Sequence, residues 1–138
     1  MNLRYIPIAV LFFLPSAMDL LISQSCSDLY ISEYIEGSSN NKCIEIYNPT
    51  PNSIDLSSTG YALKFFFNGS TSAGTTINLA GMLPGGDVYV VCDNDAAPAF
   101  LAVADQTSTS SFYNGDDAVL LLRGTDTLDI IGVIGNDP

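Results

Sequence analysis

The chain has 138 residues, of which 47% are hydrophobic and 14% charged, so it has the size of one globular domain and is neither a disordered tail nor a coiled coil. It contains no histidine, which excludes Ser-His-Asp triads, Cys-His dyads and the commonest zinc sites. Four Lys and Arg stand against fifteen Asp and Glu, and this formal net charge of -11 disfavours direct binding of DNA or RNA.

Residues 1–25 have the pattern of a secretory signal peptide. Arg4 precedes a hydrophobic stretch of about ten residues, and small residues follow near position 25. An uncleaved membrane anchor is disfavoured because Pro15 and Asp19 interrupt the apolar run, so we expect no stable membrane span. Lipidation of Cys26 is a further alternative. The domain expected after cleavage, residues 26–138, loses Arg4 and Asp19 together, so its net charge stays at three minus fourteen, or -11.

The rest of the chain is a succession of short segments rich in Ile, Val, Tyr, Phe and Leu, separated by residues typical of turns. The predicted strands are residues 28–36, 41–48, 61–67, 75–79, 87–92, 117–123 and 127–133. Seven strands at this spacing predict an all-β sandwich. One alanine-rich segment, residues 96–104, follows Asp95, a good helix-capping residue, and predicts one short helix that covers an end of the sandwich.

The register of the first hairpin decides where its acidic side chains lie. One register sets Glu33 opposite Glu45, and two facing carboxylates either cost stability or raise a pKa. The other sets Ile31 opposite Ile46 and Glu33 opposite Ile44. In that register one face carries Ile31, Ile35, Ile44 and Ile46. We expect the second register, without a carboxylate pair, because a slip of one residue would send the isoleucines to opposite faces.

The sequence allows two interpretations of the cysteines. Cys43 and Cys92 lie in predicted strands, and in an exported protein they are candidates for a disulfide. Small buried thiols explain the same pattern equally well. Three cysteines, including Cys26, allow three single bridges, and the sequence does not choose among them.

Acidic loops provide oxygen atoms that suit calcium. The weak candidate ligands are Asp93 and Asp95 in one loop and Asp116 and Asp117 in another. Neither loop has the spacing of an EF-hand, and ordinary turn and cap chemistry accounts for the same residues. We therefore expect turn roles and no cofactor, with calcium as the alternative.

Several segments resemble the bacterial lamin-tail domain family, and they do so in the same order along the chain. The most specific is residues 28–48, DLYISEYIEGSSNNKCIEIYN. The others are residues 55–57 (DLS), 76–79 (TINL), 83–88 (LPGGDV), 104–106 (ADQ), 114–119 (NGDDAV) and 131–135 (IGVIG). The resemblance covers nearly all of the chain after the predicted signal peptide.

This resemblance implies an immunoglobulin-like β-sandwich and a non-catalytic interaction or targeting module with a protein or cell-surface partner. Such domains occur in secreted bacterial proteins, often ahead of an endonuclease/exonuclease/phosphatase domain. We therefore expect the N-terminal part of a larger extracellular or cell-surface protein. The alternative is that it is the leading portion of an extracellular nuclease or phosphatase, although metal-dependent chemistry of that kind needs clustered Asp, Glu and Asn and usually His.

The resemblance also implies a further strand after the turn at residues 135–138. We therefore expect the domain to lack its last strand. The strand at residues 127–133 would then have a free edge, on which self-association with another chain is expected.

Overall fold

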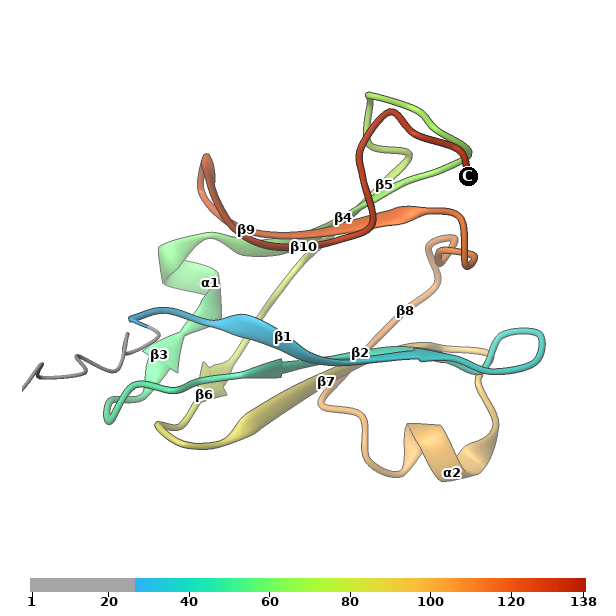
Figure 1. Cartoon of the computed structure of the whole chain (residues 1–138). Helices are drawn as coiled ribbons and strands as arrows, with labels where there is room; N and C mark the ends of the chain where they lie inside the picture. Colours follow the sequence, from blue (N-terminus) through green and yellow to red (C-terminus); the bar gives the residue numbers. More distant parts are fainter. Residues whose placement is uncertain (1–26) are drawn as a thin grey trace, which may run out of the picture.

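Two four-stranded sheets lie face to face in the computed structural model, which describes residues 27–138 (Figure 1). The first sheet contains, in spatial order, β1 (Tyr30–Glu36), β2 (Lys42–Tyr47), β7 (Val88–Asp93) and β8 (Gln106–Ser108). The second contains β10 (Asp126–Ile131), β9 (Ala118–Arg123), β4 (Tyr61–Phe66) and β5 (Thr75–Asn78). A small third sheet pairs β3 (Ile54–Asp55) with β6 (Met82–Leu83). Neighbouring strands are antiparallel, except that β7 and β8 run parallel.

The all-β sandwich is confirmed, and each of the seven predicted strands is present within a few residues of its expected bounds. β3, β6 and β8 were not predicted, because they have two or three residues each and therefore no alternation to detect. The four-residue helix α1 (Leu56–Thr59), whose first turn is capped by the Asp55 carboxylate, was not predicted either. The predicted signal peptide and the lipidation of Cys26 lie outside the described residues.

The core lies between the sheets because alternate residues of each strand point inward. The first sheet contributes Ile44, Ile46, Tyr89 and Val91, and the second contributes Leu63, Phe65, Val119 and Leu121. These side chains are almost wholly buried, and they hold the sheets together by the exclusion of apolar surface from water.

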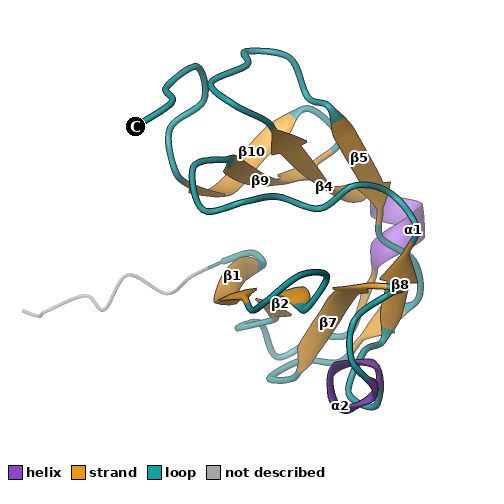
Figure 2. Cartoon of the chain, turned by 90° about the vertical axis from the view of Figure 1, so that its right-hand side faces the viewer, coloured by secondary structure: helices purple, strands orange, loops and turns teal. Residues whose placement is uncertain are grey.

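Side chains from one sheet bond to the backbone of the other at both open sides of the sandwich. On the side formed by β1 and β10, the Asp129 carboxylate accepts a hydrogen bond from the Ile31 N–H at 2.9 Å. On the side formed by β8 and β5, the Gln106 amide donates to the Asn78 carbonyl at 3.0 Å and accepts from the Ala80 N–H at 3.2 Å. Figure 2 shows these two sides to the left and right of the sandwich. Edge-strand groups that pairing within the sheets leaves free are thus partly satisfied.

The register of the first hairpin differs from both alternatives considered above. Ile31 lies opposite Ile46, as expected, but the prediction that Glu33 lies opposite Ile44 is wrong, because Glu33 lies opposite Glu45. The register shifts between Ile31 and Glu33, so Ser32 is the extra residue of a β-bulge. Beyond the bulge the faces are exchanged, and Ile35 packs on the outer face of the sheet rather than with the other isoleucines.

The predicted helix is shorter than expected and lies elsewhere. Helix α2 covers only Pro98–Leu101, and Asp95 does not cap it, because Ala97 occupies the capping position without a side-chain bond. Phe100 and Leu101 pack against a small buried cluster on the outer face of the first sheet. The helix therefore covers part of that face, below β7 in Figure 1, and not an end of the sandwich.

The segment after β10 turns back over the second sheet. Ile134 packs on the outer-face cluster of that sheet. The cluster consists of Ala62, Phe66, Ala118, Leu120 and Leu122. Gly135 lies beside Thr71, and Asp137 lies beside Gly69, so this segment follows the loop between β4 and β5. β10 is an edge strand of its sheet, and the expectation of a further strand and of self-association stays a prediction.

Neither helix in the described part of the chain has the length and apolar character needed to cross a membrane.

Candidate interaction surface

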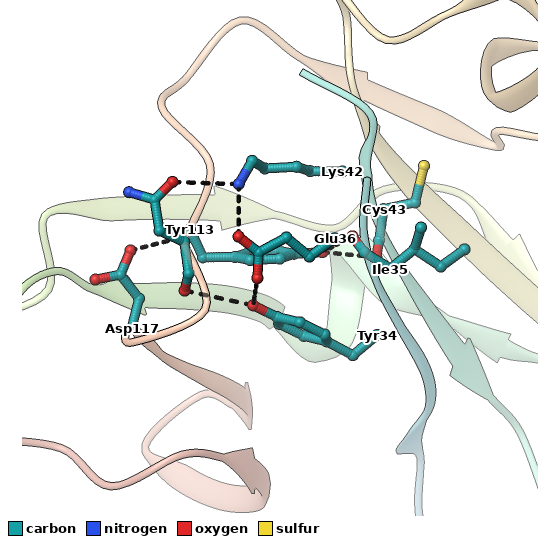
Figure 3. A network of polar contacts seen from close by, with 8 residues as sticks. Tyr34, Ile35, Glu36, Lys42, Cys43, Tyr113 and Asp117 are labelled. Atoms are coloured by element: carbon teal, nitrogen blue, oxygen red, sulfur yellow. Dashed lines mark hydrogen bonds and ion pairs between the residues drawn. The ribbon is translucent and has the colours of Figure 1, made fainter. Parts of the chain in front are cut away.

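A cluster of polar side chains joins the tip of the β1–β2 hairpin to the segment that precedes β9 (Figure 3). The Lys42 ammonium group donates to the Glu36 carboxylate and to the side-chain oxygen of Asn114, each at 3.2 Å. The Tyr34 hydroxyl donates to the other Glu36 oxygen at 3.1 Å. Lys42 is buried, so this pairing offsets the cost of removing its charge from water.

Tyr113 supports this cluster from beneath. Its hydroxyl lies 2.8 Å from the Ile35 carbonyl and 2.7 Å from the Cys43 carbonyl, which share its single proton. Its ring lies 4.4 Å from that of Tyr34, measured between centroids. Burial, the largest cause, raises the pKa of both phenols above their ordinary value. Both tyrosines therefore stay neutral even in moderately alkaline solution, where a free phenol ionises, and they act as structural hydrogen-bond donors.

A second polar contact fixes the start of the described chain. The Asp28 carboxylate accepts hydrogen bonds from the Tyr61 hydroxyl and from the Arg123 guanidinium group. Burial, assisted by the bond to Asp28, raises the pKa of Tyr61 to about 12. This contact ties the segment before β1 to β4 and β9 of the opposite sheet.

The structure gives Asp117, one of the calcium candidates, a role in the fold. Asp117 is 4% exposed, and its carboxylate oxygens accept hydrogen bonds from the Asn68 N–H at 2.8 Å and the Asn114 N–H at 2.6 Å. Asp93 likewise accepts a bond from the Asp95 N–H at 2.9 Å, as in an ordinary Asx turn. Asp116 is only partly buried. Within residues 27–138, no three His, Cys, Asp or Glu side chains form a group suited to a metal ion.

Cys43 and Cys92 lie opposite each other on β2 and β7, and a disulfide of 2.05 Å joins their sulfur atoms. The bond lies on the outer face of the first sheet, where Val90, Phe100 and Leu101 cover it. It closes a long loop in the chain, since the cysteines are 49 residues apart.

Beside this covered patch, the outer face of the first sheet carries an open groove of about 430 Å³. It is lined by Glu33, Ile35, Glu45, Asp87, Val88, Val90, Val103 and Asp105. The groove thus combines four aliphatic side chains with four carboxylates. Val88 and Val103 are 37% and 64% exposed, so apolar surface is open to solvent there.

The carboxylates of the groove have no cationic partner among the described residues. The ion pairs among the described residues join Lys42 to Glu36, and Arg123 to Asp28 and Asp126. Glu45 accepts a bond from the Ser32 hydroxyl at 2.7 Å, and Asp105 accepts one from the Val90 N–H at 2.8 Å. These neutral contacts orient the carboxylates but leave their charges uncompensated.

Sequence reasoning missed this groove. Three of its residues come from the hairpin, three surround the start of β7, and Val103 and Asp105 follow α2. The acidic pair Glu33 and Glu45 was considered, but the regular alternation that argued against it is interrupted by the bulge.

Residues 22–135 match the sequence pattern of a family described as Lamin Tail Domain. A comparison of the chain with curated proteins gives no match.

Proposed function

Because the chain belongs to the lamin tail domain family, we propose that it is a non-catalytic interaction module of an exported protein. The family is an immunoglobulin-like one without catalytic activity of its own, in agreement with the sandwich described above. The partner is a protein or a component of a cell surface.

The observation that carries this proposal is how the chain uses its polar groups. Among the described residues, every buried side-chain nitrogen and oxygen has a hydrogen-bond partner. Lys42 bonds to Glu36 and to Asn114, and Asp117 bonds to loop backbone. These contacts hold loops and strands of the domain together. By contrast, the outer-face groove presents to solvent apolar side chains that have charged ones beside them, and exposed apolar surface with a polar rim is typical of interaction sites.

Two further features support the proposal that the protein is exported. The signal-peptide pattern of residues 1–25 directs the chain out of the cytoplasm, and a disulfide persists in an oxidising exterior. The resemblance to bacterial lamin-tail domains further implies a place at the extracellular or cell surface, as the N-terminal part of a larger bacterial protein.

If that larger protein is a nuclease or phosphatase, this domain attaches or orients it and does not hold its substrate. At a net charge of -11 the domain repels a polyanion over a Debye length of roughly 10 Å at 0.1 M salt.

The test is to incubate the purified chain with DNA, RNA and phosphate esters in the presence of Mg²⁺, beside a mock preparation. We expect no turnover above the mock and no submicromolar DNA binding at physiological salt. Turnover that copurifies with the chain would overturn the non-catalytic function.

A further inference from the structure

We infer that the outer-face groove of the first sheet binds an extended cationic segment of a partner protein, in which one face carries both Lys or Arg residues and apolar residues. The inference rests on the proposed interaction function and specifies its partner. It follows from the placement of like charges, from the absence of a compensating cation among residues 27–138, and from the exposed valines between the charges.

The bulge at Ser32 brings like charges together. Glu33 lies opposite Glu45 across β1 and β2, and Glu45 lies opposite Val90 across β2 and β7. Asp105 is bonded to the Val90 N–H, so a third carboxylate borders the same row of residues. Like charges on directly opposed strand positions destabilise a sheet. A cation bound among these carboxylates therefore reduces their mutual repulsion and is itself attracted to them.

The described chain offers no cation of its own to this row. Lys42 and Arg123 are held in ion pairs with other carboxylates. Lys64 lies on β4, in the opposite sheet. A second copy of this acidic chain, a nucleic acid or an anionic membrane would add to the repulsion. Charge complementarity therefore selects a cationic occupant.

The valines distinguish a peptide from a simple cation. Val90 lies on the floor of the groove, and the exposed Val88 and Val103 border it. A metal ion or a small amine would leave this apolar surface in water. Side chains two residues apart in an extended peptide point in the same direction, so a segment with Lys and apolar residues on one face reaches the carboxylates and the valines together. The volume of about 430 Å³ is also within the range of ligand sites.

The experiment measures binding of a fluorescent, capped peptide to the purified chain by anisotropy. Its repeat is Lys-Ser-Val-Ser, so that Lys and Val share one face of the extended peptide, and it is called the Lys–Val peptide. Two matched peptides replace either all Lys by Glu or all Val by Ser. The test variant of the chain is Glu33→Gln/Glu45→Gln. Its control is Asp126→Asn/Asp137→Asn, which removes two exposed charges from the side of the second sheet and gives the same net charge.

We expect the Lys–Val peptide to bind, and the Glu–Val peptide not to bind. The Glu33→Gln/Glu45→Gln variant should weaken binding about tenfold, as the loss of two partly exposed charge contacts implies. The control variant should weaken it less than about twofold, since distant charges are screened. Val103→Ser should weaken it about fivefold through lost apolar contact, and the Lys–Ser peptide should bind correspondingly less tightly.

Three results would overturn the inference. They are no binding of the Lys–Val peptide, equal weakening in the two charge variants, or equal binding of the Lys–Val and Lys–Ser peptides. Each would leave the interaction function in place on another surface, whereas turnover in the hydrolysis test would remove that function itself. Melting temperatures show whether each variant is folded under the conditions of the binding measurement. Because the substitutions remove the repulsion between the two carboxylates, Glu33→Gln/Glu45→Gln should be at least as stable as the unmodified chain.

Discussion

Glu33 faces Glu45 across paired strands of an acidic chain, and the extra residue that permits this pairing is Ser32. With Ile31 directed into the core, regular alternation would direct Glu33 inward as well. The bulge instead leaves both Ser32 and Glu33 exposed and returns Tyr34 to the core side, where it packs on Tyr113. The arrangement exchanges a buried charge, which would cost several kcal/mol, for a much weaker repulsion at the surface.

Deletion of Ser32 should therefore be tolerated. The shortened strand can pair regularly, with Ile31 still opposite Ile46 and Glu33 still opposite Glu45, so we expect a loss of about 1 kcal/mol or less in the free energy of unfolding. Deletion of Glu45 is the matched control. It would slip the rest of β2 by one residue and turn part of its buried face outward, which should prevent folding. Urea unfolding followed by circular dichroism measures both, and a Ser32 deletion that fails to fold would contradict the bulge.

The sheets could be predicted because the signals that specify them are local. β-branched and aromatic residues are abundant over the six or seven positions of β1, β2 and β7, and turn residues separate these segments. The alanine content of residues 96–104 favours a helix of ordinary length, and the predicted helix was too long for this reason. In the structure only Pro98–Leu101 is helical, since the apolar side chains of this segment pack on the sheet instead.

The groove could not be predicted because it depends on residues that are distant in the sequence. A bulge has no reliable signature in one sequence, and its position reverses the faces of every later residue in the strand. The contribution of Val103 depends on how the segment after α2 returns to β8, next to β7. The bonds of Asp117 are more local, because its carboxylate accepts from the N–H of Asn114, three residues earlier, and short polar side chains beside Asn-Gly commonly bond to loop backbone.

Asp117→Asn should destabilise the chain by about 1–3 kcal/mol, because the amide presents a donor to one of two backbone N–H groups that need an acceptor. Since this role is structural, millimolar Ca²⁺ should shift the melting temperature of neither the variant nor the unmodified chain. Differential scanning calorimetry with Ca²⁺ and with a chelator measures both effects. A calcium-dependent rise that the variant loses would instead assign Asp117 to a cation site. Asp95→Asn, an exposed position, serves as the control.

Removal of the Cys43–Cys92 disulfide should lower stability substantially, because the bond restricts an unfolded loop of 49 residues. Loop entropy gives about 4 kcal/mol as an upper figure, and we expect about 2–4 kcal/mol for Cys43→Ala/Cys92→Ala. Reduction of the unmodified chain should lower its melting temperature toward that of the variant and should leave the variant itself unchanged. Equal melting of oxidised and reduced chains would show that the two thiols act only as buried apolar groups.

Stability should fall in alkaline solution because of the buried tyrosines, above all Tyr113. Burial raises the pKa of Tyr113 in the folded chain, whereas in the unfolded chain it is near 10. Its contribution is therefore complete below pH 10 and decreases above it, because only the unfolded chain then releases the proton. The slope approaches about 1.4 kcal/mol per pH unit for this residue, and Tyr34 and Tyr61, whose pKa values are also raised, add to it.

Tyr113→Phe separates this ionisation from other effects of alkali. The variant should lose about 1–3 kcal/mol at pH 7, because the Ile35 and Cys43 carbonyls lose their shared donor. Between pH 10 and 11.5, however, its stability should fall less steeply than that of the unmodified chain, since no proton remains to be released at this position. Urea unfolding at several pH values, with brief incubation, gives both slopes. If the free energy of unfolding fell equally steeply with pH in the variant and the unmodified chain, the phenol would ionise equally readily in the folded and unfolded states. Burial of its hydroxyl between two backbone carbonyls would then not be what keeps it neutral.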